Sequence, residues 1–230
     1  MVPKIIHCCW FGGPKTPLAE RCQASWRDFA PDWTIREWNE SAVERLAENA
    51  GIAGLEFFRN AIREKKWAMA SDWARMAVLL AEGGLYLDLD SELVAPLDSL
   101  PSGEWTAGER TARGDVWMAA GAGLSLEKDS NVARHMLDAY KDLPFDPNRE
   151  MMPWINERLS ETNLRVLDPD IMCPIGVDGR LRATDRTVGI HQYAMSWAGP
   201  KQRILKWLSW HGFRWLVDFA LRIRRTWRAR

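Results

Sequence analysis

The sequence lacks the features that mark several specialised classes of protein. It has no net charge, because Lys plus Arg and Asp plus Glu number 31 each. The longest stretch without a charged residue, 187–200, is shorter than the roughly 20 apolar residues that a membrane-spanning helix needs. We see no internal repeat, no low-complexity linker and no Cys-x-x-Cys pair. These absences argue against a bulk nucleic-acid binder and against a membrane-spanning protein.

The composition is that of an ordinary globular protein. Apolar residues make up 47% and charged residues 27% of the sequence. The length of 230 residues is enough for one large domain or two small ones. The N-terminal residues 1–11 carry one Lys and no small-residue cleavage site, so we expect no secretion signal. We predict reduced, buried thiols, typical of a cytosolic protein, for the four cysteines: Cys8, Cys9, Cys22 and Cys173.

The charge is distributed unevenly along the chain. Residues 200–230 hold nine Lys or Arg and one acid, Asp218, so this tail carries +8 and residues 1–199 carry −8. The tail has apolar residues near helical spacing, a break at Gly212 and four tryptophans: Trp207, Trp210, Trp215 and Trp227. It fits an amphipathic helix in a membrane interface, and almost equally a helix packed on the core with a basic edge. We therefore predict a domain at 1–199 and a tail at 200–230, without a nucleic-acid partner.

The order of the expected elements indicates an α/β sheet. A strand at 4–10, a helix capped by Thr16 and a strand at 33–38 form a strand–helix–strand opening. A helical tract at 55–82, interrupted near Lys65, ends at two glycines before a strand. The other expected elements are helices at 41–49, 131–141 and 154–159, and strands at 85–87, 105–107, 116–120 and 188–190.

The strongest local signal for chemistry is the Asp-x-Asp of Asp88 and Asp90. Residues two apart in a strand point to the same side, so we expect the carboxylates about 6–7 Å apart at the end of an apolar strand. Charges placed there need a cation or hydrogen-bond donors. Carboxylates of this kind suit Mg²⁺ or Mn²⁺. A phosphatase of the haloacid dehalogenase type also has Asp-x-Asp after a strand, but near its N-terminus and before a Gly-Thr-like pair, unlike Ser91-Glu92 here.

Two further groups accompany this motif. Asp72 and Arg75 are three residues apart, so they share a helix face and can pair with each other or with a ligand. The alternative is a surface ion pair that contributes little. Trp10 stands at the exit of the first strand beside Gly12-Gly13, where the backbone can approach a ligand. The alternative is that Trp10 belongs to the core.

Together these motifs resemble a known family. They are Pro3-Lys4-Ile5-Ile6-His7 with Trp10-Phe11-Gly12-Gly13, Ser71-Asp72-x-x-Arg75, and Gly83-Gly84-x-Tyr86-x-Asp88-x-Asp90. In this order they look like glycosyltransferase family 32, the family of the DXD sugar-binding region. It includes fungal initiating mannosyltransferases and bacterial capsule and lipopolysaccharide transferases, and it shares its core with the clostridial glucosylating toxins. His191 followed by Ser196-Trp197 resembles the closing motif of the family, although the residues between them depart from the commoner pattern.

The resemblance implies a Rossmann-like GT-A fold, a UDP- or GDP-linked sugar donor with a UDP-hexose favoured, Mn²⁺ or Mg²⁺, and retention of configuration. By analogy, Trp10 stacks on the base, and Asp72 with Arg75 holds the ribose or sugar. Asp90 binds the metal, and Asp88 reaches the ribose, the sugar or a metal-bound water. The predicted metal ligands are thus Asp90, Asp88 and His191. Ser196 adds to the diphosphate environment, and Trp197 closes over the leaving group.

We therefore predict a hexosyltransferase in surface polysaccharide biosynthesis, with Asp88, Asp90 and Arg75 as its catalytic residues. The acceptor is a saccharide or a lipid-linked saccharide, and the tail suits a peripheral position at the cytoplasmic face of the membrane. The alternative of a different class is a membrane-docked protein that binds a nucleotide-sugar without catalysis. A phosphatase with an Asp-x-Asp motif is the third alternative.

Overall fold

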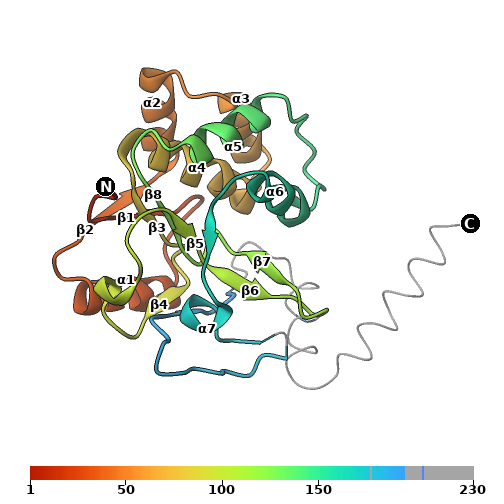
Figure 1. Cartoon of the computed structure of the whole chain (residues 1–230). Coiled ribbons are helices and arrows are strands. Elements are labelled where there is room, and N and C mark those ends of the chain that lie inside the picture. The colour runs from red at the N-terminus through yellow and green to blue at the C-terminus, as the bar shows by residue number, and fades with distance from the viewer. Residues whose placement is uncertain (177, 195–203, 205–230) are drawn as a thin grey trace, which may run out of the picture.

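A six-stranded sheet forms the centre of the molecule (Figure 1). The structure is a computed structural model and describes residues 1–176, 178–194 and 204. The strand order is β2-β1-β3-β8-β5-β9. The strands span Ile5–Cys9 (β1), Thr34–Trp38 (β2), Gly84–Tyr86 (β3), Trp105–Thr106 (β5), Leu124–Leu126 (β8) and Arg165–Val166 (β9).

Most of this sheet is parallel. Strand β1 pairs in parallel with β2 and β3, and β5 pairs in parallel with β9. Strand β8 is antiparallel to both β3 and β5, so it is the one reversed strand among the six. A mostly parallel sheet needs cover on both faces, and this architecture confirms the predicted α/β class.

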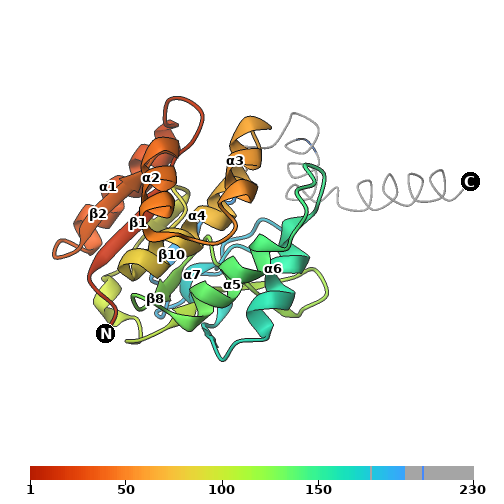
Figure 2. The ribbon, with the colours of Figure 1, turned by 90° about the horizontal axis from the view of Figure 1, so that it is seen from above.

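Helices cover the two faces of the sheet unequally (Figures 1 and 2). One core cluster packs α2 to α6 against β1, β3 and β8, and α5 contacts both α4 and α6. The other cluster packs α1 and α7 against the opposite side chains of β1 and β3. The helices span Pro17–Phe29 (α1), Glu40–Ala50 (α2), Leu55–Arg63 (α3), Trp67–Glu82 (α4), Asn131–Lys141 (α5), Met151–Ser160 (α6) and Pro169–Met172 (α7), with a 3-10 turn at Leu97–Ser99 (η1).

Local sequence signals fix the helix ends as predicted. The Thr16 side chain accepts a hydrogen bond from the Ala19 amide at 3.2 Å, and Pro17 is the first residue of α1. The expected interruption near Lys65 separates α3 from α4, and Lys65 itself has φ of 54°. Gly83 closes α4 at φ of 69° and donates its amide to the Leu79 carbonyl. The chain can therefore turn from α4 directly into β3.

A buried histidine ties this turn to the centre of the sheet. His7 Nε2 lies 2.8 Å from the Gly83 carbonyl oxygen, and Trp38 Nε1 lies 3.0 Å from His7 Nδ1. A carbonyl only accepts and an indole only donates, so the neutral ring with its proton on Nε2 satisfies both partners. Burial lowers the pKa of His7 despite the Gly83 carbonyl and Glu82. The start of β3 is thus held against β1.

Two small antiparallel sheets complete the fold. Strand β4 (Ser91–Leu93) pairs with β10 (Gly189–His191), and β6 (Gly108–Arg110) pairs with β7 (Val116–Met118). The predicted late strand at 188–190 is therefore β10, shifted by one residue, and the strand at 116–120 ends earlier than expected. The sequence prediction did not include the short strands β4, β6, β8 and β9 or the single-turn helix α7, because two to four residues are too few to show a period.

The thiol prediction agrees with the structure, in which all four cysteines are free and buried. Within the described residues, no helix is long and apolar enough to cross a bilayer. The tail predicted at 200–230 lies outside the described residues except for Ile204.

Candidate active site

The predicted site residues gather where β1 and β3 end. Trp10 directly follows β1, and Asp88 lies two residues beyond β3. These strands are parallel neighbours, so their carboxyl ends meet at one edge of the sheet. Ligands in open α/β sheets bind at this edge.

The two aspartates lie in a turn rather than on a strand. Strand β3 ends at Tyr86, and the Ser91 amide donates to the Asp88 carbonyl at 2.9 Å across the turn. The expectation that strand alternation aligns Asp88 and Asp90 was therefore wrong. A tight turn between β3 and β4 brings the two carboxylates to the same site instead.

Asp88 is fixed from three directions. The Tyr86 hydroxyl donates to Asp88 Oδ1 at 3.1 Å, and Arg75 Nη2 lies 3.5 Å from the same oxygen. The Asp88 amide donates to the Gly121 carbonyl at 2.7 Å. A side chain at Gly121 would place its Cβ 2.0 Å from Asp88 Oδ2, so only glycine leaves room for this carboxylate. Sequence reasoning missed Gly121; the only signal was a run of small residues at 119–123.

Asp72 and Arg75 form a buried ion pair one turn apart on α4. Arg75 Nη2 lies 3.0 Å from Asp72 Oδ1, and the side chains are 7% and 11% exposed for Arg75 and Asp72. The alternative of a surface ion pair therefore does not hold. Burial raises the pKa of Asp72 to about 6 against the opposing charge of Arg75, with a further contribution from Asp88. Burial disfavours the charged form of Arg75, but Asp88 and Asp72 together raise its pKa, so the guanidinium remains charged.

Asp90 is held by residues from the far end of the described chain. His191 Nε2 lies 3.2 Å from Asp90 Oδ1, and the Ala194 amide donates to Asp90 Oδ2 at 2.8 Å. Burial alone would raise the pKa of Asp90, yet His191 and the Ala194 amide hold it below its usual value. Burial disfavours the charged form of His191, while Asp90 raises its pKa well above the usual value. The β4–β10 pairing thus brings together residues that are up to 104 positions apart in the sequence.

The three predicted metal ligands come together in the structure. One ligand atom from each of Asp88, Asp90 and His191 lies within 4.8 Å of the other two. Two carboxylates and an imidazole fit a divalent cation, and carboxylate oxygens suit Mg²⁺ or Mn²⁺. The donor set therefore supports the predicted cofactor class.

Trp10 is half-buried at the rim of this site. Its indole N–H donates to the Gly13 carbonyl at 2.8 Å, and it packs partly against the core cluster of α1. Gly12 in the same loop lies against another indole, that of Trp67. A Cβ added at Gly12 would be 2.5 Å from Trp67 Cε2. Trp67 is the first residue of α4, and sequence reasoning did not single it out. Ser196 and Trp197, predicted to contact the donor, lie outside the described residues.

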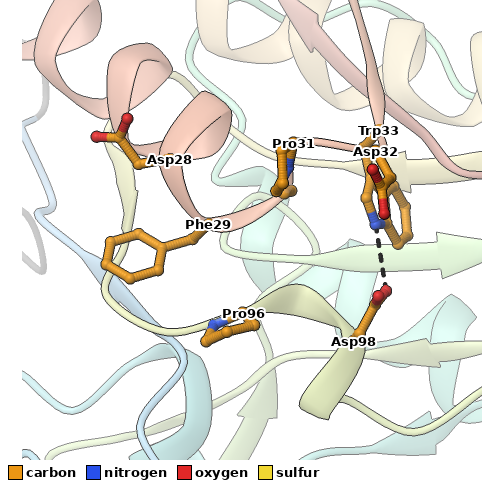
Figure 3. Close-up of a pocket in the computed structure, with 8 residues that line it drawn as sticks. Asp28, Phe29, Pro31, Asp32, Trp33, Pro96 and Asp98 are labelled. Atoms are coloured by element: carbon orange, nitrogen blue, oxygen red, sulfur yellow. Dashed lines mark hydrogen bonds between the residues drawn. The ribbon is translucent and has the colours of Figure 1, made fainter.

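The groove drawn in Figure 3 does not belong to this site. It is a cavity of about 260 Å³ between the end of α1 and η1, with Trp33 and Asp98 facing each other across it. Trp33 lies just before β2. Lys4, which forms an ion pair with Asp98, lies just before β1. The groove is therefore at the amino ends of these strands, opposite the aspartates.

A family model of glycosyltransferases matches part of this chain, including most of the site residues. Residues 17–106 match the family model described as "Glycosyltransferase sugar-binding region containing DXD motif". The matched range contains Asp72, Arg75, Asp88 and Asp90, and it ends before His191. None of the curated proteins matches the chain. The match confirms the resemblance to DXD glycosyltransferases and supports an enzyme of the transferase class.

Solved structures of glycosyltransferases are similar to this chain at low sequence identity. The structure described as "PaToxG Glycosyltransferase" is 19% identical, with a TM-score of 0.55 over 70% of this chain and 69% of that chain. "Crystal structure of the UDP-bound glycosyltransferase domain from the YGT toxin" describes another, 11% identical over 71% of this chain and 68% of that one, at a TM-score of 0.47. The likeness to the first structure shows that the fold resembles that of GT-A glycosyltransferases.

Proposed function

We propose that this protein is a metal-dependent glycosyltransferase that moves a hexose from a nucleotide-sugar to a saccharide or lipid-linked acceptor with retention of configuration. The observation that carries the proposal is the convergence of Asp88, Asp90 and His191 within 4.8 Å. This convergence lies beside the buried Asp72–Arg75 pair, at the edge of the sheet where ligands bind. The matched DXD region contains all but one of these residues.

Asp90, Asp88 and His191 would hold the divalent cation, Mn²⁺ or Mg²⁺. When bound, the cation would offset the charge that develops on the departing nucleoside diphosphate. The Tyr86 hydroxyl and Arg75 keep the Asp88 carboxylate in place, while the Ala194 amide does the same for Asp90. The protein thus supplies a preorganised set of ligands, which requires little rearrangement during the reaction.

Arg75 and Asp72 would bind the ribose or the transferred sugar. Among the described residues, Arg75 Nε is buried without a hydrogen-bond partner, so it has a donor to offer to a ligand oxygen. Asp72 can accept from sugar hydroxyls. Trp10 would stack on the base through the part of its ring that the core leaves uncovered, and Ser196 with Trp197 would close over the diphosphate.

Retention does not require a protein base in this scheme. The departing phosphate oxygen takes the proton of the acceptor hydroxyl as the new glycosidic bond forms on the same face. Asp88, Asp90 and Arg75 are then the catalytic residues, and they act by holding the cation and the donor. A UDP-hexose is the favoured donor, and a GDP-linked sugar is the alternative.

The basic tail at 200–230 would place the enzyme on the cytoplasmic face of the membrane, where lipid-linked acceptors of surface polysaccharides lie. Nine basic residues and four tryptophans favour an anionic membrane interface. Truncation near Pro200 should release the protein from anionic vesicles in a sedimentation assay. Equal vesicle binding by the full and truncated chains would remove the tail from this role.

The central experiment is a titration of UDP- and GDP-sugars with and without Mn²⁺, following thermal unfolding and donor hydrolysis together. We expect stabilisation by one nucleotide only when Mn²⁺ is present, and slow hydrolysis of one sugar donor. Stabilisation without hydrolysis, even with candidate acceptors, would indicate a binding protein rather than an enzyme. Hydrolysis of a generic phosphate ester would indicate the phosphatase, and no response to any nucleotide would refute the proposed donor site.

A further inference from the structure

Ser91 lies directly opposite His191 in the β4–β10 ladder. Residues that face each other across an antiparallel pair put their side chains on the same face, with Cβ atoms about 4.5–5.5 Å apart. A serine hydroxyl and an imidazole at that separation can meet by rotation of their side chains. Ser91 also directly follows Asp90, so it borders the same site from within the turn.

Both side chains have a buried polar atom without a partner. Among the described residues, Ser91 Oγ and His191 Nδ1 are both inaccessible and neither makes a hydrogen bond, and Ser91 is only 1% exposed. Buried polar atoms without partners are costly, so each calls for an explanation. Two such atoms on facing residues suggest one interaction that forms only in another state of the site.

The backbone of Ser91 is fixed from the side of α1. The Trp26 indole, 0% exposed, donates to the Ser91 carbonyl at 2.7 Å. The Ser25 hydroxyl accepts a hydrogen bond from the Leu93 amide at 2.9 Å. Helix α1 therefore binds one edge of β4 while β10 pairs with the other, and the hydroxyl of Ser91 is what can still rotate.

The chemistry of a histidine ligand supplies the missing interaction. His191 Nε2 faces Asp90 at 3.2 Å, so it is the ring nitrogen that can reach the cation. In the ion-free site Nε2 faces Asp90, which favours the charged ring, so the cation changes the partner of Nε2. A nitrogen that ligates a cation carries no proton, and the ring, now neutral, keeps its proton on Nδ1. Ligating histidines almost always donate this second N–H to an acceptor, which orients the ring.

We propose that Ser91 is a positioning residue whose hydroxyl accepts the Nδ1–H of His191 when a divalent cation binds Asp88, Asp90 and His191. This inference rests on the proposed function, because it assumes the cation. In the ion-free protein the hydroxyl has no hydrogen-bond partner among the described residues, and in the ion-bound protein it fixes the ring of His191.

Cys173 is the competing partner for the ring. The Cys173 thiol interacts with the His191 side chain. Burial lowers the pKa of the imidazole, whereas Asp90, and to a smaller extent Cys173, raises it. A thiol is a weak acceptor, and a hydroxyl is a better one. Cys173→Ala therefore belongs in the same experiment as Ser91→Ala.

The test compares Ser91→Ala with Ser125→Ala in the full chain, using Mn²⁺ in the presence of UDP as the probe. Ser125 is also a buried serine, but its hydroxyl already donates to the Gly103 carbonyl at 2.9 Å, away from the aspartates. Calorimetric titration should show Mn²⁺ binding about tenfold weaker in Ser91→Ala, the lower end for a lost partner of a ligating histidine. Its melting temperature without Mn²⁺ should be unchanged or higher, because the hydroxyl has no partner to lose. Ser125→Ala should show a lower melting temperature and unchanged Mn²⁺ affinity.

The outcomes separate this inference from the proposed function. If Asp90→Asn abolishes Mn²⁺ binding while Ser91→Ala binds like the wild type, the inference fails and the cation site stands. If Cys173→Ala weakens binding and Ser91→Ala does not, the thiol is the partner and the inference is likewise overturned. If the wild type binds no Mn²⁺ with UDP, both the proposed cation site and the role of Ser91 are refuted.

Discussion

The two aspartates of the Asp-x-Asp turn are held by different kinds of structure. Asp88 contacts Arg75, Tyr86 and the Gly121 loop, all parts of the packed centre of the fold. Asp90 instead contacts His191 and the Ala194 amide, which reach it through the three-residue strand β10. The Asp88 side therefore shares its contacts with the core, whereas the Asp90 side depends on a short ladder formed by the end of the described chain.

The difference has an energetic consequence. On the Asp88 side, the buried guanidinium of Arg75 balances two carboxylates, so removing it leaves the buried Asp72 carboxylate without a compensating charge. On the Asp90 side, the charged partner is an imidazole, which can lose its proton when Asp90 is neutralised, so no fixed charge is left buried. We expect mutations on the first side to reduce both stability and activity, and mutations on the second side to reduce activity much more than stability.

The largest effect should follow from Arg75→Met. The substitution keeps much of the side-chain volume but leaves Asp72 and Asp88 without their cation, and breaking a buried ion pair costs about 3–5 kcal/mol. Urea unfolding should show this loss, together with loss of donor turnover. Adding Asp72→Asn should restore part of the stability without restoring activity. If Arg75→Met unfolds like the wild type, the Asp88 side is not coupled to the core.

Asp90→Asn should give the opposite pattern. The amide keeps the shape of the side chain and one acceptor oxygen, so we expect a change of about 1 kcal/mol in the free energy of unfolding. The loss of ligand charge should reduce turnover by about 10²–10³-fold, because electrostatic stabilisation is the main term in such a site. Steady-state donor hydrolysis at saturating Mn²⁺ measures this loss. Near-normal turnover that still requires Mn²⁺ would remove Asp90 from the set of ligands.

Gly121→Ala tests whether the Asp88 side depends on a missing side chain. The added Cβ would meet Asp88 Oδ2 at 2.0 Å, so the carboxylate must rotate away from its present position. We expect Mn²⁺ affinity in the presence of UDP to fall about tenfold, with about 1–3 kcal/mol lost from overpacking. The matched control is Gly123→Ala, whose Cβ would meet Trp105 at 3.1 Å and not the aspartates. Equal Mn²⁺ affinities in the two variants would show that Gly121 matters only for packing.

The same contrast explains what the sequence could predict. Some features depend only on residues that are close in the chain, and the structure has them as predicted. They are the helix ends at Thr16, Lys65 and Gly83 and the pairing of Asp72 with Arg75. Local signals of capping, spacing and glycine are sufficient for such features. The fold class followed from the same alternation of strands and helices.

Features that depend on distant residues were not predictable in this way. The expected strand at Asp88 and Asp90 is a turn, since the apolar pattern cannot show where a ladder stops. The room that Gly121 leaves for Asp88 follows from contacts between separate loops, and nothing local in the sequence reports them. His191 was placed near the aspartates only through its resemblance to a family motif, and the β4–β10 register that brings it there became visible only in the structure.

Trp10 belongs to neither side, and it separates donor binding from ion binding. In Trp10→Ala the aspartates keep all their contacts, so Mn²⁺ affinity without nucleotide should not change. Loss of base stacking, worth about 1–3 kcal/mol per base, should weaken nucleotide-sugar binding about tenfold in a titration. The matched control is Trp33→Ala, a partly buried indole in the groove at the opposite end of the sheet, which should bind the donor like the wild type. Because Trp10 also packs on the α1 core, both variants should lose some stability, and only a difference in donor affinity between them assigns the ring to the base. If both bind the donor equally, Trp10 is a core residue, and Trp67 beside Gly12 becomes the aromatic ring to test.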